Sequence, residues 1–204
     1  MSKQKLPEGF ETRVATIELR ADGDVPKIVG HAAVFNKLSL NLGGFRETIE
    51  LGAFENAIGE SDIRSLFNHD PNFILGRSPD TLSVREDDVG LFTETTPPDT
   101  QTVRDMVLEP MRRGDLTQMS FAFRIDQGGD DWFEDDDGRL VRTIKKGGVK
   151  ELFDISPVTY PAYPDTDVAV RSIHDMLETD EERKRLITAH AAYRARRIRL
   201  MALD

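Results

Sequence analysis

The amino-acid sequence predicts a mainly β fold with a few flanking helices and a helical C-terminal tail. Three observations point there: many short apolar runs between Gly, Asp and Pro turns, two short helical patterns among them, and a change of character after Arg171. The chain has 204 residues, of which 38% are hydrophobic and 31% charged, so one globular domain with a substantial core is expected. Many short strands with such turns indicate a barrel or a sandwich.

The strand predictions depend on alternation of polar and apolar residues. Residues 13–20 alternate as a half-buried strand does. Residues 27–35 form a second run, with Gly30 where a bulge or a sharp bend would fit. The other predicted strands are residues 45–51, 63–68, 81–85, 90–95, 118–126, 140–145 and 149–160.

Two helical patterns interrupt the strands. Residues 53–58 form a short one, and Asp99 or Thr100 can N-cap a longer one that Gly114 would end. Pro110 is expected to cut this longer helix early. Its apolar positions at helical spacing are Val103, Met106, Val107 and Met111.

The C-terminal tail differs from the rest of the chain. Residues 172–204 contain neither Pro nor Gly and show helical spacing, which predicts one helix, or two broken near residues 179–182. Residues 183–199 carry seven Lys or Arg and no acid, although the whole chain has a net charge of −10. We therefore expect a β domain over residues 1–171 and a separate tail over residues 172–204, with different partners for the two.

Composition argues against several functional classes. The chain has no cysteine, so disulfides, thiolate metal sites and a cysteine nucleophile are excluded. Residues 1–7 lack the apolar core of a signal peptide, and no stretch approaches the roughly 18 apolar residues of a membrane span, so a protein of a reducing cytoplasm is expected. The acidic body is not expected to bind nucleic acid electrostatically.

One acidic stretch, residues 130–138, resembles a calcium loop. However, setting Gly138 as the turn glycine of an EF-hand puts Phe133 in the first ligand position, so a solvated hairpin loop is the better interpretation. The sequence also lacks a phosphate-binding glycine loop and a His pair at zinc spacing. We expect no cofactor and no metal.

A histidine, a serine and a carboxylate in strand-like runs are the parts that activate a serine hydroxyl. Ser120 is the candidate nucleophile, because it shares a strand face with the small Ala122 and so leaves room for a substrate. For a strand serine taken alone, a role as a small filler is the commoner case.

His69 is the candidate base, since it lies where a strand ends and a polar group can face a cleft. An ordinary turn residue is the competing interpretation, because Asp70 and a proline follow it. Three other histidines are weaker candidates: His31 lies inside a strand, and the others are in the tail, at His174 and His190.

Asp154 is the candidate third member, because large apolar residues flank it in a predicted core strand. Burying a carboxylate there is costly unless an imidazole or a similar group pairs with it. Glu151, predicted on the opposite strand face, is the alternative acid, and Asp70 is too close in sequence to His69. The order His, Ser, acid differs from that of chymotrypsin, subtilisin and the α/β-hydrolases.

With these residues placed, the chain from about Arg13 to Arg171 resembles the prohead protease family of tailed bacteriophages. The shared phrases, in chain order, are residues 30–36 (GHAAVFN), 45–49 (FRETI), 52–54 (GAF), 67–70 (FNHD), 75–77 (LGR), 98–100 (PDT), 119–123 (MSFAF) and 155–163 (ISPVTYPAY).

The resemblance implies a small antiparallel β-barrel with helices around it, distantly similar to the herpesvirus assemblins. It implies a serine endopeptidase with His69 as base, Ser120 as nucleophile and Asp154 in a third position that is often Glu in the family. Because Asp is one methylene shorter than Glu, Glu151 stays open as a substitute. Arg77 is an implied helper.

The resemblance also implies partners and a location. The expected substrates are a scaffold protein or the scaffolding segment of the major capsid protein, and the protease itself, cleaved inside the assembling procapsid in the host cytoplasm. Self-association is expected, and the tail would be a docking or self-cleaved segment. The alternatives are a non-catalytic capsid-interior or scaffolding protein that retains the fold, and a small-molecule esterase with the same triad.

Overall fold

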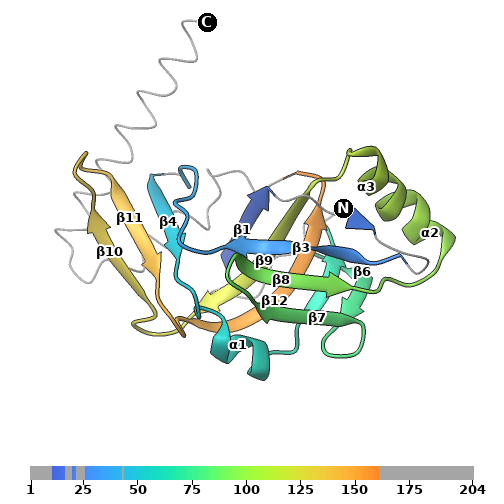
Figure 1. The fold of residues 1–204 in the computed structure, drawn as a ribbon, viewed down its shortest axis with the longest axis horizontal. Coiled ribbons are helices and arrows are strands. Elements are labelled where there is room, and N and C mark those ends of the chain that lie inside the picture. The colour runs from blue at the N-terminus through green and yellow to red at the C-terminus, as the bar shows by residue number, and fades with distance from the viewer. Residues whose placement is uncertain (1–10, 17–19, 22–25, 43, 161–204) are drawn as a thin grey trace, which may run out of the picture.

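The computed structural model describes residues 11–16, 20–21, 26–42 and 44–160, and these are mainly β with few helices, as predicted (Figure 1). The strands are β1 (Glu11–Thr16), β2 (Arg20–Ala21), β3 (Ile28–Val34), β4 (Phe45–Ile49), β5 (Arg64–Phe67), β6 (Asp70–Arg77), β7 (Leu82–Glu86), β8 (Gly90–Thr95), β9 (Gln118–Ile125), β10 (Asp130–Glu134), β11 (Leu140–Ile144) and β12 (Val149–Val158). The helical elements are α1 (Glu55–Glu60), α2 (Gln101–Val103), the π-helical turn η1 (Arg104–Leu108) and α3 (Glu109–Arg113). The predicted tail and its boundary at Arg171 lie outside the described residues.

The strands of the described residues form three sheets, with the orders β1-β9-β12-β5-β6, β2-β3-β8-β7 and β10-β11-β4. Neighbouring strands are antiparallel except in the pairs β12–β5 and β11–β4. The expected closed barrel is therefore not found in this part of the chain. Register shifts in β3 and β12 mark bulges, which bend a strand locally and interrupt its regular alternation.

The core lies against one face of β9. Phe121 and Phe123 on that face are buried. Helix α1 lies at the lower side of the molecule in Figure 1. The ring of Phe54, just before α1, meets the ring of Phe121 edge to face with centroids 5.5 Å apart. Each such buried aromatic contributes about 1.5–3 kcal/mol of hydrophobic stabilisation. This packing holds β9 firmly, which matters because its other face carries Ser120.

The long predicted helix runs through Pro110 instead of ending there. The preceding turn is π-helical, and Glu109 donates its N–H to the carbonyl five residues earlier. We attribute this wider turn to Pro110, which lacks an N–H and would clash with the carbonyl four residues before it. The caps are the predicted Thr100 and Gly114. Met106 is exposed, contrary to expectation, and the buried face consists of Val103, Val107 and Met111.

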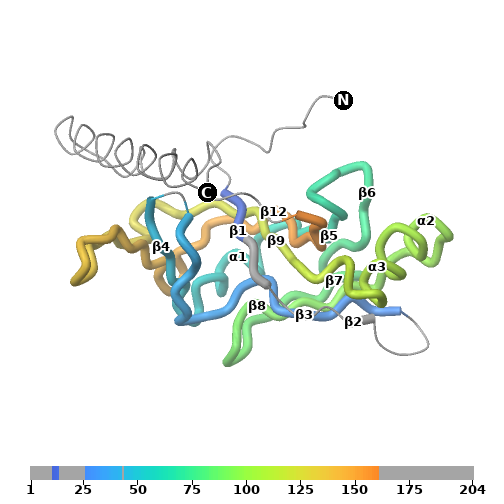
Figure 2. Tube along the Cα trace, turned by 90° about the horizontal axis from the view of Figure 1, so that it is seen from above, coloured from blue at the N-terminus to red at the C-terminus, as the bar shows by residue number. Residues whose placement is uncertain are grey.

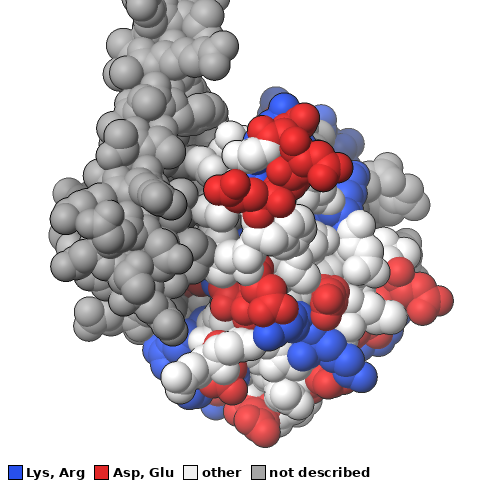
Figure 3. Space-filling view, turned by 90° about the vertical axis from the view of Figure 1, so that its left-hand side faces the viewer, with Lys and Arg blue, Asp and Glu red and all other residues white. Residues whose placement is uncertain are grey.

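Besides the two-residue strand β2, two strands were not predicted. β6 begins with Asp70 and Pro71, which favour a turn, but β6 is a sheet edge, where a proline breaks no ladder on the free side. β10 lies in the acidic stretch and pairs with β11, with Asp130 opposite Ile144 at one end of the ladder. The loop of this hairpin is therefore shorter than predicted, residues 135–139, because the first half of the acidic stretch is a strand. Its acids contribute to the face of β10, β11 and β4, on which red side chains gather in Figure 3.

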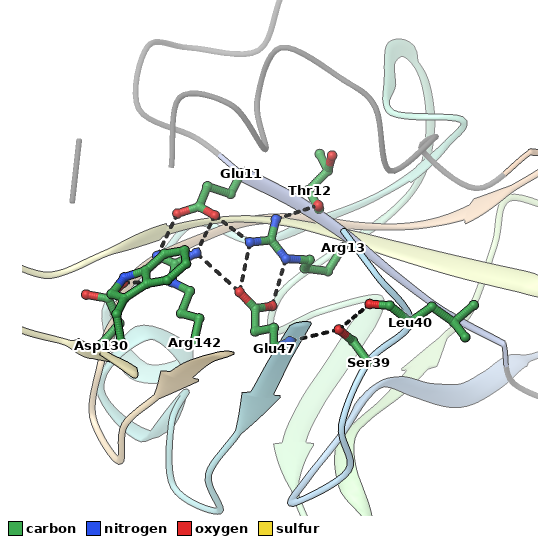
Figure 4. Close-up of polar contacts among 9 residues, drawn as sticks. Glu11, Thr12, Arg13, Ser39, Leu40, Glu47, Asp130 and Arg142 are labelled. Atoms are coloured by element: carbon green, nitrogen blue, oxygen red, sulfur yellow. Dashed lines mark hydrogen bonds and ion pairs between the residues drawn. The ribbon is translucent and has the colours of Figure 1, made fainter. Parts of the chain in front are cut away.

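A buried ion network joins the first and third sheets (Figure 4). Arg13 of β1 donates to both carboxylate oxygens of Glu47 in β4, at 2.7 and 2.8 Å. Arg142 of β11 donates to Glu11 at 2.6 and 2.9 Å and to Asp130 at 2.6 Å. The members are cross-linked, since Arg13 also donates to Glu11 at 2.6 Å and Arg142 to Glu47 at 3.2 Å. Removing one member would leave its buried partners with fewer counter-charges, at a cost of up to about 3–5 kcal/mol. The network therefore fixes β1, the strand beside β9.

Candidate active site

His69 occupies the turn of the β5–β6 hairpin. Phe67 pairs with Asp70, so only Asn68 and His69 form the loop, and both have positive φ, 55° and 57°. Two positive φ values define the type I′ turn, which matches the twist of a hairpin. From above, the hairpin and the end of β12 lie side by side (Figure 2). The turn thus brings His69 to the strand that carries Asp154.

Ser120 lies in β9 on the face away from the core, as the alternation predicted. Its strand neighbours Met119 and Phe121 are buried in the core, whereas Ser120 and Ala122 point to the other side. Across the sheet Ser120 is opposite Ser156 of β12. The serine is thus held on a central strand between two paired neighbours.

Asp154 reaches the same face through a β-bulge. Leu152 pairs with Phe123 and Asp154 pairs with Ala122, so Phe153 is an extra residue on β12. In a regular strand without this bulge, Asp154 would point to the core face together with Leu152, because side chains at positions i and i+2 share a face. The bulge turns the carboxylate of Asp154 from the core toward His69.

The three side chains form a continuous hydrogen-bonded chain. Asp154 Oδ1 lies 2.6 Å from His69 Nδ1, and Ser120 Oγ lies 2.8 Å from His69 Nε2. With Asp154 ionised, Nδ1 carries the imidazole proton and Nε2 can accept the hydroxyl proton of Ser120. This is the geometry of a general base poised on a nucleophile.

Burial and a third hydrogen bond mark this cluster. Asp154 is 0% exposed, and Ser156 Oγ donates to its Oδ1 over 2.5 Å. Within the described residues Asp154 Oδ2 is buried without a hydrogen-bond partner. A carboxylate so placed gains from every donor it has, so His69 and Ser156 both offset its desolvation.

The alternative acid lies farther along the sheet. Glu151 pairs across the strands with Arg124, four residues beyond Ser120, and its Oε2 lies 3.4 Å from Arg124 Nη1. The prediction that Glu151 and Asp154 lie on opposite faces of the strand is wrong. They share a face, because the bulge inserts Phe153 between them. Asp154, not Glu151, is the acid against His69.

Two other candidates are engaged elsewhere. Arg77 is an exposed side chain whose Nε donates to Asp62 over 2.7 Å. His31 bonds Asp87 and stacks edge to face on Phe92. Neither makes a recorded contact with Ser120 in the described part of the chain. That part also contains no cluster of His, Asp and Glu suited to a metal ion, and no helix long and apolar enough to cross a membrane.

Sequence reasoning missed Ser156 and Asn68. Ser156 follows Asp154 by two residues in one strand, and that spacing alone indicates a shared face. Asn68 precedes His69 and bonds Thr159 at the end of β12, across 91 residues of sequence. The role of Ser156 could have been found from its spacing to Asp154, whereas no local pattern indicates the bonds between Asn68 and Thr159.

The chain was compared with protein families, solved structures and curated proteins. A family model described as Caudovirus prohead serine protease matches residues 11–180. A solved structure of the bacteriophage T4 capsid assembly protease is 12% identical, with a TM-score of 0.41, covering 72% of this chain and 98% of that one. At these values the structural likeness adds nothing to the family match. The search of curated proteins produced no match.

Proposed function

The chain belongs to the Caudovirus prohead serine protease family, and on that premise we propose that it is an endopeptidase with Ser120, His69 and Asp154 as its catalytic residues. Family membership implies a role in capsid maturation. One observation carries the residue assignment: the His69 ring lies between a serine hydroxyl at 2.8 Å and a buried carboxylate at 2.6 Å.

The mechanism follows from this order of contacts. Ser120 Oγ attacks the peptide carbonyl while His69 Nε2 takes its proton, and the resulting imidazolium gives that proton to the leaving amine. Water then attacks the acyl-enzyme, with His69 again acting as base. Asp154 holds the proton on Nδ1 throughout and stabilises the positive charge when the ring is doubly protonated.

Asp154 is favoured over Glu151 as the acid on two grounds. Its Oδ1 lies within hydrogen-bond distance of His69 Nδ1, so the Asp154 side chain reaches the ring although it is one methylene shorter than Glu. It is also fully buried, where electrostatic stabilisation of an imidazolium is strong, whereas the Glu151 side chain is 41% exposed and paired with Arg124.

The proposed substrates are a scaffold protein or the scaffolding segment of the major capsid protein, and the protease itself. This rests on family membership, which implies capsid and scaffold partners. The proposed place of action is the interior of the assembling procapsid in the host cytoplasm. The basic residues 183–199 would pair with acidic or amphipathic scaffold helices, as a docking arm.

The deciding experiment compares the chain with its Ser120→Ala variant on the capsid protein of the same phage. We expect Ser120→Ala to lose processing by about 10⁴-fold or more at unchanged folding. Ser65→Ala is the matched control, because Ser65 is an equally buried strand serine whose hydroxyl has no partner within the described residues.

A serine-reactive phosphonate provides the second arm of that test. The adduct is expected on Ser120 and is expected to vanish in His69→Gln. Normal processing by Ser120→Ala would refute Ser120 as the nucleophile. If a well-folded parent chain neither cleaves the capsid protein nor forms an adduct, a non-catalytic relative with a retained fold is the better account. Cleavage of small esters but of no protein would favour the esterase.

A further inference from the structure

The backbone at His69 is in a conformation that a histidine seldom adopts. Its φ of 57° lies in the left-handed region, which is uncommon for residues with a side chain. In a type I′ turn this second loop position is usually glycine, and the first is often asparagine, as Asn68 is here. A histidine in this position needs support from its surroundings.

Asn68 makes three hydrogen bonds to the end of β12. Its backbone N–H donates to the carbonyl of Pro157 over 3.0 Å. Its side-chain Oδ1 accepts the backbone N–H of Thr159 over 2.8 Å, and its Nδ2 donates to Thr159 Oγ1 over 3.2 Å. One residue thus joins the turn that carries His69 to the strand that carries Asp154.

We propose that Asn68 is a positioning residue, whose side chain holds the His69 ring in register with Asp154 and Ser120. The proposal rests on the proposed function, because the register matters only if His69 is the base. A displacement of about 1 Å in a catalytic group can cost about 10²-fold in rate. Both Asn68 and Thr159 are exposed, so losing their side-chain bonds should alter geometry more than stability.

The competing explanation is that Asn68 is present only because asparagine tolerates positive φ. Asn68→Gly separates the two roles, since glycine adopts that φ freely but makes no side-chain bond. Asn68→Asp keeps an acceptor for the Thr159 N–H and loses the donor to Thr159 Oγ1. Asn36→Gly is the matched control, because Asn36 is another exposed asparagine with positive φ, 52°, outside the site.

We expect Asn68→Gly to lower kcat about 10- to 100-fold with KM and Tm little changed, and Asn68→Asp to lower it less. Asn36→Gly should match the parent chain. A parent-like kcat in Asn68→Gly overturns the proposal, as does an equal loss in Asn36→Gly or a rise in KM alone. If Asn68→Gly folds poorly, Asn68→Asp carries the same comparison.

A spectroscopic measurement tests positioning without relying on protease activity. The ¹⁵N shifts of the neutral His69 ring report which nitrogen bears the proton, and contact with Asp154 favours Nδ1–H. We expect that tautomer to dominate in the parent chain and a mixture in Asn68→Gly. An unchanged tautomer together with unchanged kcat refutes the role of Asn68. Absence of Ser120-dependent cleavage in the parent chain instead refutes the proposed function, while the tautomer measurement still decides on Asn68.

Discussion

Two histidine–aspartate pairs occur among the residues that the structure describes, and one of these two adjoins a serine. His69 contacts Asp154 through Nδ1 and Ser120 through Nε2, so its two nitrogens link an acid to a hydroxyl. His31 contacts both carboxylate oxygens of Asp87 through the single nitrogen Nε2, at 3.0 and 2.9 Å. In the His31–Asp87 pair a single ring nitrogen contacts a single acid, so this ring does not link two groups between which a proton could pass.

Burial separates the two aspartates as well. Asp154 is fully buried, whereas the Asp87 side chain is 30% exposed in a turn. Partial desolvation raises the pKa of Asp87, but hydrogen bonds from the Gly90 N–H, His31 and the Val89 N–H outweigh it and lower the pKa to about 2. Asp87 therefore acts as the acceptor that organises a turn.

A histidine–aspartate contact is therefore not itself a catalytic signature. What distinguishes His69 is a hydroxyl on its second nitrogen and an acid shielded from water, where charge interactions are stronger. Both pairs join residues more than 50 positions apart in sequence, so proximity along the chain distinguishes neither.

The largest expected contrast is between the two histidines. His69→Gln should lower kcat/KM by about 10⁴- to 10⁶-fold, because no base then accepts the Ser120 proton. His31→Gln should leave it within about twofold of the parent value, since that ring meets no catalytic group. Steady-state cleavage of a capsid-protein peptide measures both. A large loss in His31→Gln at intact folding would break the comparison.

The two aspartates should differ next. Asp154→Asn should lower kcat by about 10⁴-fold, because an amide can stabilise the wrong tautomer of His69. Asp87→Asn and Glu151→Gln should each stay within about twofold of the parent. A ranking in which Glu151→Gln is the more damaging change would move the acid assignment to Glu151.

A smaller effect is expected at Ser156, which has no counterpart at Asp87. Its hydroxyl donates to the charged Asp154, and such hydrogen bonds contribute about 1.5–3 kcal/mol. If roughly half of that reaches the transition state, Ser156→Ala lowers kcat/KM about 4- to 13-fold. Ser65→Ala is again the control, and equal rates for both variants would show that the hydroxyl does not support Asp154.

The smallest expected effect concerns stability at low pH. The pKa of Asp87 is lowered from its ordinary value of 3.8 to about 2 on folding, so the folded state favours the carboxylate. Its contribution is therefore fully present above pH 4 and is lost as the pH falls toward about 2. Urea midpoints between pH 5 and pH 2 should fall less steeply in Asp87→Asn than in the parent. Parallel profiles would contradict the assigned role of Asp87.

Much of the candidate site could be predicted from local sequence. Alternation in residues 118–126 placed Ser120 opposite the large apolar side chains, and the polar residues before Pro71 placed His69 at a strand end. Both patterns depend on a period of two and on turn preferences, which are properties of neighbouring residues. The same dependence on neighbouring residues explains why β6 and β10 were not predicted. Each strand begins with residues that locally favour turns, and pairing with another strand supplies the missing stability.

The sequence by itself determined the mainly β class, the turns, and the residue types that a serine hydrolase requires. The tertiary structure decided which acid lies against His69, because the Phe153 bulge changes the face of Asp154 through its register with β9. It also decided the split into three sheets and the bonds of Asn68 to Thr159. These features depend on contacts between segments far apart in the chain, whose register no local periodicity encodes.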